Sequence, residues 1–240
     1  MWILKINHEW MNISDLMSGL MMIFLFIAIA FMLETQSEKE ELKRTQDSIK
    51  EIAVTYRQSQ QSLNQDLNKE FQKDLEIWEA EITKDNIFRF HSPEVLFSIG
   101  SIEISNRFQE ILNDFFPRYL NLLTSKKYIN DIDEIRVEGH TSNDWNDKTS
   151  EQQIYLKNMK LSQDRANNVL TYCYNINHII IKKHRNWLET KFRANGMSFS
   201  KMIYQENGAV NLLKSRRVEF KVLTSAQEKI YKIIEQLDKN

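Results

Sequence analysis

Residues 10–33, WMNISDLMSGLMMIFLFIAIAFML, decide how this chain is built. From residue 16 to residue 33 there are 18 positions without a charged side chain, and only Ser18 and Gly19 interrupt their apolar character. As a helix rising about 1.5 Å per residue, this run would extend about 27 Å, close to the ~30 Å hydrocarbon core of a bilayer. We therefore predict a transmembrane helix over residues 10–33, preceded by a short leader of residues 1–9.

Asp15 lies one residue before the apolar run begins. A carboxylate at the edge of a membrane span is costly, so it commonly faces a partner or an aqueous path and exchanges protons. The alternative is a capping role, because Ser14 and Asp15 are both good N-cap residues and a negative charge is favourable at a helix N-terminus. The residues alone leave both interpretations open.

Composition excludes several classes of function. The net charge of −1 offers no basic surface for nucleic acid, so we expect no direct nucleic-acid partner. The single cysteine, Cys173, excludes an internal disulfide framework. The sequence has neither metal-ligand spacing among its histidines nor a Ser–His–acid set, a Gly-rich phosphate loop or an HExxH pattern. We therefore expect no enzymatic activity, no metal site and no cofactor.

Residues 34–86 are predicted to form a helical spacer. Residues 34–85 contain no Gly or Pro, and their apolar residues recur at intervals of three, four and seven, which marks one helical stripe. The stripe consists of Leu42, Ile49, Ile52, Tyr56, Leu63, Leu67, Phe71, Leu75, Trp78 and Ile82. A second copy of the chain is the simplest cover for it, which predicts a homodimer. The alternative is a solvated, partly disordered spacer.

Residues 87–240 are predicted to form one domain of mixed helix and strand. Strands are expected over residues 88–90, 95–97, 132–138, 191–196 and 217–223. Helices are expected from Ser105 to a break or bend at Pro117, over residues 161–174 and over residues 226–237. Strands separated by helices indicate an α+β sandwich with the helices on one face of the sheet.

Four segments of this domain carry a resemblance to a known family. LFSIGSIEIS (residues 96–105), IRVEGHTS (135–142), NMKLSQDRANNVLTYC (158–173) and SRRVEFKV (215–222) occur in the order seen in OmpA-like peptidoglycan-binding domains. The front end, WMNISDLMSGLMMIFLF (residues 10–26), resembles the single span of MotB-type stator subunits. Together the two resemblances imply a subunit of a membrane rotary motor, fixed to the cell wall.

In the MotB-type family, the Asp at the start of the span binds the translocated ion, and that position is Asp15 here. Flagellar B subunits usually have a longer, basic leader, whereas the short leader and the DLMSGLM form of the span (residues 15–21) resemble the MotB-like subunits of Zorya anti-phage defence systems. In that family two B subunits sit inside a ring of five MotA-like A subunits with long cytoplasmic tails. A flagellar stator subunit and a passive peptidoglycan tether remain the alternatives.

The same resemblance implies the remaining partners and the topology. The partners are a MotA-like A subunit, a second copy of the chain, peptidoglycan and, indirectly, cytoplasmic defence effectors, and the expected translocated ion is a proton. The protein would cross the bacterial inner membrane once, with its N-terminus in the cytoplasm and its C-terminal domain in the periplasm.

The OmpA-like resemblance also implies a site for the cell wall. That family grips the carboxylate end of the diaminopimelate side chain in the stem peptide, with an Arg in the pattern LSxxRA that falls on Arg165 here. The Leu of the pattern is Leu161, and the family Asn seven residues before the Arg is Asn158. The family Asp of GHTD, which meets the ammonium group of the ligand, is replaced by Ser142, and Asp144 is an alternative source of that charge.

For residues at and near that site, the sequence also suggests purely structural roles. For Arg165 the alternative is a surface salt bridge on its helix. For Arg216 and Arg217 we expect structural pairing, and for His140 a local hydrogen bond.

Overall fold

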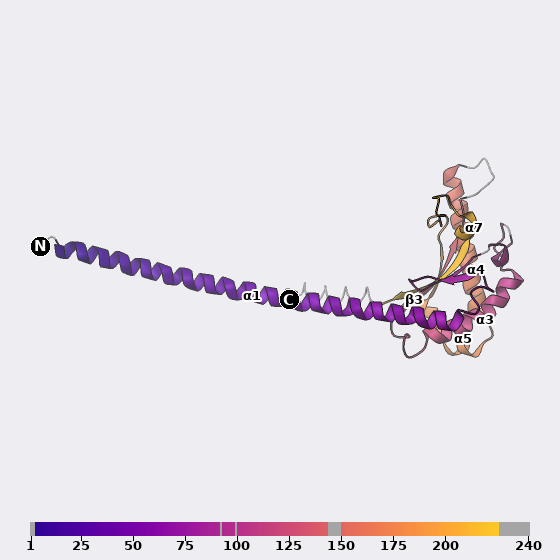
Figure 1. The fold of residues 1–240 in the computed structure, drawn as a ribbon, viewed down its shortest axis with the longest axis horizontal. Helices are drawn as coiled ribbons and strands as arrows, with labels where there is room; N and C mark the ends of the chain where they lie inside the picture. Colours follow the sequence, from indigo (N-terminus) through magenta and orange to yellow (C-terminus); the bar gives the residue numbers. More distant parts are fainter. Residues whose placement is uncertain (1–2, 92, 99, 144–149, 226–240) are drawn as a thin grey trace. The chain divides into compact units, whose positions relative to one another are not determined.

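The computed structural model describes residues 3–91, 93–98, 100–143 and 150–225. Its first element is α1, Ile3–Phe71, a single helix of 69 residues (Figure 1). The helix contains the predicted span, in which an 18-residue window has a mean hydropathy of 2.6 and no residue is buried within the protein. Apolar side chains are exposed on all sides of this stretch: the exposed fraction is 76% for Leu16 and 69% for Phe31. A helix that is apolar on every side needs a lipid or protein environment.

The start of α1 bears on the capping interpretation of Asp15. Because the helix begins at Ile3, it includes most of the leader and places Asp15 well inside the helix. The hydroxyl of Ser18 donates to the carbonyl of Ser14 at 2.8 Å, within the same turn. A residue in a helix interior does not cap free N–H groups, so the capping interpretation of Asp15 is wrong.

The C-terminal part of α1 belongs to the folded domain. The compact unit that contains the sheet begins at Val54, and therefore includes residues 54–86, which the sequence assigns to the spacer. Leu63, Leu67 and Phe71 are buried in its core, where the ring of Phe71 packs edge-on against Phe88 at 5.3 Å between centroids. In this part of the stripe the chain's own domain is the cover, so the inference of a second copy from these residues is wrong.

Buried amides hold the same part of α1 in place. Asn86, which adopts a left-handed φ of 60°, donates from Nδ2 to the carbonyl oxygen of Gln60 at 3.0 Å and accepts at Oδ1 from Asn64 Nδ2 at 3.0 Å. The polar segment around residue 60 is thus a well-bonded helix, because a turn of the domain satisfies its side chains.

A five-stranded sheet with the order β1-β2-β5-β3-β4 forms the centre of the domain. Its strands are β1 (Ala80–Ile82), β2 (Ile87–Phe90), β3 (Ile132–His140), β4 (Phe192–Gly196) and β5 (Arg217–Thr224). Neighbouring strands are antiparallel except β3 and β4, which are parallel. The four strands expected at 88–90, 132–138, 191–196 and 217–223 are confirmed, and β1 lies where the sequence predicts helix.

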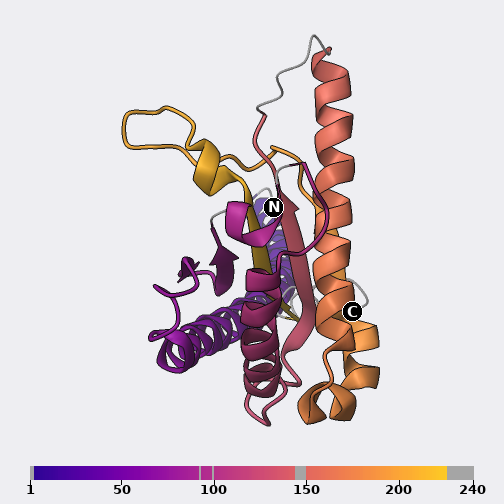
Figure 2. The same cartoon turned by 90° about the vertical axis from the view of Figure 1, so that its right-hand side faces the viewer.

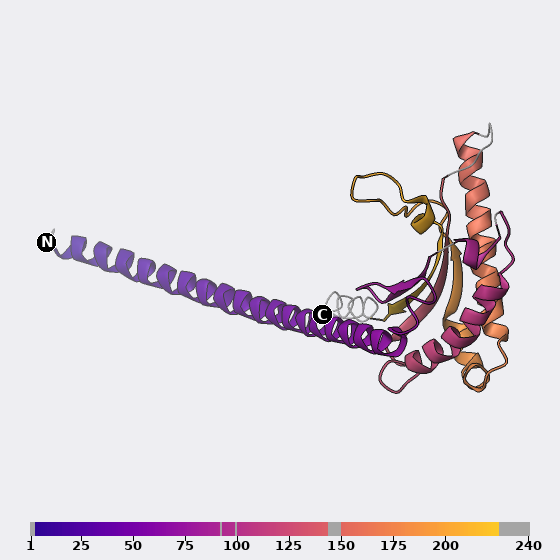
Figure 3. The same cartoon turned by 45° about the vertical axis from the view of Figure 1, so that its right-hand side comes forward.

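The helices of the domain flank this sheet (Figures 2 and 3). They are α2 (Pro93–Leu96), α3 (Asn106–Leu123), α4 (Glu151–Asn175), α5 (Ile179–Lys183), α6 (Arg185–Lys191) and α7 (Leu212–Ser215). The strand expected at 95–97 is wrong, since most of it lies in α2. The helix expected over 226–237 lies outside the described residues.

Helix α3 begins where the sequence predicts and continues further. The hydroxyl of Ser105 caps it by accepting from the N–H of Phe108 at 3.0 Å. The helix then passes through Pro117 without ending, although proline cannot donate the usual backbone bond. Phe115 and Tyr119, on the two sides of Pro117, are both fully buried, so tertiary packing outweighs the lost hydrogen bond.

The two faces of the sheet differ in chemistry because side chains alternate along each strand. Val218 and Phe220 of β5 and Val137 of β3 are buried on the face that the helices cover. Glu219 of β5 and its partner Glu138 of β3 are buried on the opposite face. The sheet thus has an apolar, helix-covered face and a face that carries buried charges.

Two glycines let α4 lie directly on the sheet. Gly139 of β3 pairs with Gly196 of β4, and α4 crosses over both. A Cβ atom on Gly139 would lie 2.2 Å from the carbonyl oxygen of Ser162, and one on Gly196 would lie 2.6 Å from the backbone nitrogen of Gln163. Only glycine permits this approach. The close contact sets the position of the buried face of α4, which carries the predicted wall-binding residues.

Candidate functional site

Arg165 lies on the buried face of α4 and is 7% exposed. Its Nε donates to the carbonyl oxygen of Ser101 at 2.9 Å, and the carbon of its guanidinium group lies 4.7 Å from the ring centroid of Phe97. One polar bond and one aromatic face therefore fix the planar group in place. The surface salt bridge considered for this residue is not formed within the described part of the chain, where no carboxylate pairs with it.

Arg165 borders a small pocket, and a second arginine without a carboxylate partner in the described residues, Arg216, borders it as well. Arg165, Arg216 and Arg217 all border it, together with Phe97, Gly139 and His140, and its volume is about 10 Å³. The Nε atom of Arg216 is buried and has no hydrogen-bond partner among the described residues. Arg217 is paired with Glu219, whereas Arg165 and Arg216 have no carboxylate partner among the described residues. Such guanidinium groups are suited to an anion, and the pocket has room for about one oxygen-sized group.

The electrostatics of the pocket agree with that interpretation. Burial, and then the nearby positive charge of Arg216, lower the pKa of Arg165 to about 10. The guanidinium still carries its charge at neutral pH, but the folded protein holds it at a cost. A carboxylate bound between Arg165 and Arg216 would neutralise the repulsion and accept hydrogen bonds from both.

The sequence analysis expected structural pairing for Arg216, but no carboxylate among the described residues pairs with it. The adjacent Arg217 does pair structurally, with its Nε 2.6 Å from Glu219 Oε1, as expected. Because consecutive side chains at a strand point to opposite faces, Arg216 is directed away from that pair and toward α4. The alternation in the RRVEF segment was the signal that could have revealed it.

The other predicted wall-binding residues do not line this pocket. Asn158 lies on the same buried face of α4, about two turns before Arg165, and its Nδ2 is buried without a partner among the described residues. Ser142 is buried just beyond the end of β3, and Leu161 is half-buried on α4. Asp144 lies outside the described residues. The structure therefore brings Arg165 and Arg216 to one pocket, whereas Asn158 and Leu161 lie in the N-terminal half of α4 and Ser142 lies just after β3.

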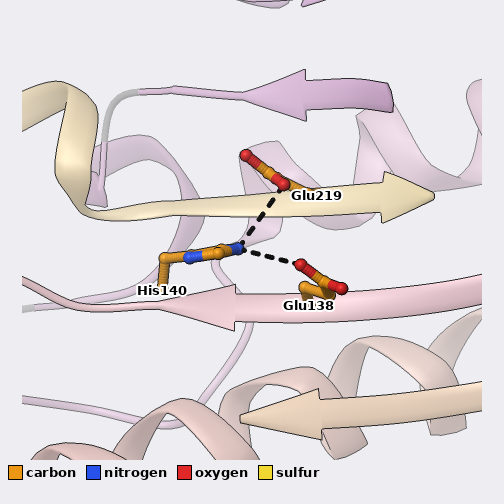
Figure 4. Close-up of side chains that lie close together, drawn as sticks. All are labelled: Glu138, His140 and Glu219. Carbon is orange, nitrogen blue, oxygen red and sulfur yellow. Dashed lines mark ion pairs between the residues drawn. The ribbon is translucent and has the colours of Figure 1, made fainter. Parts of the chain in front are cut away.

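A buried cluster of titratable groups lies next to this pocket, on the charged face of the sheet. Figure 4 shows His140 between Glu138 and Glu219, with its Nε2 at 3.5 Å from one carboxylate oxygen of each. All three side chains are nearly inaccessible to solvent, and their ligand atoms lie within 4.8 Å of one another, as in a metal site. His140 therefore meets two carboxylates rather than the single local hydrogen bond that the sequence suggests.

The surrounding charges do not favour a metal ion in this cluster. Arg217 and Arg89 hold Glu219 Oε1 at 2.6 and 2.7 Å, and Arg136 Nη1 lies 3.7 Å from Glu138 Oε1. Each of the two carboxylates thus already has a guanidinium group beside it, and these positive charges oppose the entry of a divalent cation. The cluster instead suits a charge network that joins β2, β3 and β5.

The second candidate site is the segment around Asp15 in α1. Residues three and four positions apart share a helix face, so Ser18 and Gly19 lie on the same side as Asp15. A Cβ atom on Gly19 would have no neighbour within 4 Å. Small residues of this kind allow another helix to approach closely in a membrane. The carboxylate of Asp15 thus lies where a partner helix could reach it.

Comparisons with known proteins agree with the class defined by these features. The model of the OmpA family matches residues 96–216, which run from the last residue of α2 through α7. The protein is therefore an OmpA-family protein that carries a membrane-length helix at its N-terminus.

A relative similar over nearly the whole chain defines the family more narrowly. The Zorya protein ZorB of Escherichia coli is 46% identical over 231 residues, which cover 96% of this chain and 94% of the relative. The chain belongs to the ZorB family.

Solved structures with low sequence identity resemble the domain as well. The cell wall anchor of the T6SS from Pseudomonas aeruginosa is 20% identical, with a TM-score of 0.44, and the match covers 66% of this chain and 96% of that one. The periplasmic domain of Helicobacter pylori MotB is 17% identical, with a TM-score of 0.44, over 65% of this chain and 97% of that one.

Proposed function

We propose that this protein is the ion-translocating, wall-anchored B subunit of a membrane rotary motor in anti-phage defence. The observation that carries the proposal is the position of Asp15, inside a continuous helix and directly before an uncharged run of membrane length. Membership of the ZorB family supports the assignment to a Zorya system over a flagellar one. No enzymatic step is part of this proposal.

Asp15 would serve as the ion carrier because its charge can alternate. An ionised carboxylate is held by water or a polar partner, whereas the protonated acid can pass an apolar wall at far lower cost. A proton that crosses the membrane releases about 2.3 kcal/mol per 100 mV, which suffices to bias small rotational steps. The small residues next to Asp15 would let a MotA-like A subunit close around it.

The anchoring function would reside in the arginine pocket. One oxygen of a stem-peptide carboxylate would enter the pocket beside the guanidinium groups of Arg165 and Arg216, which lack a carboxylate partner in the described part of the chain. Ser142 in place of the family Asp removes one contact to the ligand's ammonium group. We therefore infer that this chain binds the carboxylate end of the ligand more strongly than its ammonium end.

The proposed assembly follows from these two sites. Residues 10–33 would cross the inner membrane, residues 34–53 would form the linking helix, and the unit that begins at Val54 would bind the wall in the periplasm. Two copies of the chain would sit within a ring of five A subunits, and cytoplasmic defence effectors would respond to the motor. The apolar residues Leu42 and Tyr56, which are 60% and 44% exposed, remain available for contact between the two copies.

Phage plaquing tests this function on cells that carry the gene with its native neighbours. Asp15→Asn keeps the size of the side chain and removes its charge, so we expect protection to be lost while the protein stays in the membrane. Asp47→Asn is the matched control, because Asp47 is an exposed acid of the same helix beyond the apolar run. Equal protection by wild type and Asp15→Asn would refute the ion path and favour a passive tether.

A further inference from the structure

A groove rich in asparagine runs between α3 and α4. Its volume is about 750 Å³, within the ~300–1,000 Å³ range of small-molecule sites. The residues that define this asparagine groove are Asn106, Asn113, Asn168, Asn175, Asn177 and Tyr172. It lies entirely within the unit that begins at Val54 and does not include the arginine pocket.

The lining of the asparagine groove suits a neutral ligand with many hydroxyl and amide groups. Among the described residues that border it, Glu103 alone is charged. Each asparagine amide offers two donors and one acceptor oxygen, which is the pattern that sugar hydroxyls and acetamido groups complement. The phenol of Tyr172 adds an aromatic body with a polar tip.

Two of these amides are held in place. Asn113 Nδ2 donates to the hydroxyl of Tyr172 at 2.9 Å, and Asn168 Nδ2 donates to the carbonyl oxygen of Ile102 at 2.8 Å. No hydrogen bond between described residues uses the Oδ1 atom of either asparagine. Their orientation is therefore fixed by one side of the amide, while the acceptor oxygen stays available for a ligand.

The asparagine groove begins next to the arginine pocket. Arg165 and Asn168 are neighbours on α4, and they donate to the adjacent carbonyl groups of Ser101 and Ile102. From Arg165 to Asn175 the helix rises about 15 Å. Three residues of extended peptide span about 10 Å, so a peptide anchored by its carboxylate at Arg165 can place an attached sugar in the asparagine groove.

We propose that the asparagine groove binds the glycan of the wall fragment whose stem peptide occupies the arginine pocket. The ligand class is a β-1,4-linked chain of N-acetylated amino sugars. This proposal rests on the wall-binding part of the proposed function, and it adds a second contact that recognises sugar rather than peptide. A wall fragment held at both places is fixed in orientation along α4, which a single carboxylate contact does not achieve.

Calorimetric titration of the full-length protein in detergent tests the proposal. The two probes are a diaminopimelate-containing tripeptide and the same tripeptide attached to the disaccharide of N-acetylglucosamine and N-acetylmuramic acid. We expect wild type to bind the disaccharide–tripeptide about tenfold more tightly than the tripeptide, as one or two additional neutral hydrogen bonds would give.

Variants of exposed groove residues provide the second readout. Thr171→Ala with Asn175→Ala removes two exposed side chains that line the asparagine groove, and we expect it to abolish the advantage of the sugar while tripeptide affinity stays unchanged. Asn167→Ala is the matched control, because Asn167 is an exposed asparagine of α4 outside the groove. It should retain the full advantage of the sugar.

The outcomes separate this proposal from the one on which it rests. Equal affinity of wild type for the two probes overturns the asparagine groove as a glycan site and leaves peptide binding intact. An advantage of the sugar that survives in the double variant also overturns it. If wild type binds neither probe, the wall-binding function fails, and the asparagine groove fails with it.

Discussion

Replacement of Arg165 by methionine should stabilise the free protein and abolish its binding to the stem peptide. Burial and the charge of Arg216 lower the pKa of Arg165 well below its ordinary value, to about 10. A pKa shift of that size corresponds to a cost of about 3 kcal/mol for the charged side chain. Methionine has a similar length and adapts to irregular apolar surroundings, so it can fill the space beside Phe97 without that cost.

The stability gained by removing the buried charge is partly offset by the loss of the contacts that Arg165 makes. Its hydrogen bond to Ser101 contributes about 1 kcal/mol, and its contact with the ring of Phe97 contributes about 0.5–2 kcal/mol. We therefore expect Arg165→Met to raise the free energy of unfolding by about 1 kcal/mol, which is a rise of about 2–4 °C in Tm for a chain of this size. The loss of two charge-assisted hydrogen bonds should weaken tripeptide binding about a hundredfold.

The assay compares thermal unfolding and tripeptide titration of the full-length protein in detergent. Lys160→Met is the matched control, because Lys160 is a cation of the same helix whose side chain is 79% exposed and pairs with Asp164. It should change stability by less than about 0.5 kcal/mol and leave binding unchanged. If Arg165→Met instead lowers stability by more than about 1 kcal/mol and still binds the tripeptide, Arg165 is a structural residue and the reasoning is refuted.

Two further predictions concern the sheet. Gly139→Ala places a Cβ atom 2.2 Å from the Ser162 carbonyl, so it should push α4 outward, cost about 2–3 kcal/mol of stability and weaken tripeptide binding. Urea unfolding measures the stability and titration measures the binding. Wild-type values in both assays would contradict the close packing of α4 on the sheet. Burial by itself raises the pKa of Glu219, but His140 and Arg217 outweigh it and hold the pKa well below its ordinary value of 4.5. The stability that Glu219 contributes is therefore complete above about pH 4.5 and lost as the pH falls below it. Urea unfolding between pH 7 and pH 3.5 should show a shallower decline for Glu219→Gln than for wild type, and parallel curves would exclude this role of the cluster.

Local patterns in the sequence were sufficient for much of the fold. The uncharged run at residues 16–33 identifies the membrane-length helix because length and apolarity are properties of the segment alone. The alternation in residues 217–223 identifies β5 because a strand with one buried face must repeat every second residue. Arg165 was identified as a candidate because it occupies the Arg position of the family pattern LSxxRA, among short motifs in the family order. Matching that pattern required no knowledge of which residues surround Arg165 in space.

Long-range contacts decided the rest. The apolar stripe of α1 has the same spacing whether a second chain or the chain's own domain covers it, so only the tertiary structure shows that Leu67 and Phe71 pack inside the domain. The helix through Pro117 continues because distant side chains bury it on both sides of the proline.

The arginine pocket likewise depends on residues far apart in the chain. Arg216 faces Arg165 because β5 lies beside β3 and because Gly139 lets α4 approach the sheet. The sequence by itself determined the membrane-length helix and four of the five strands, since those follow from periodicity along the chain, but it failed at β1 and at residues 95–97. The tertiary structure decided which charges are brought together and left without a counter-charge, since that depends on packing between segments that no local pattern records.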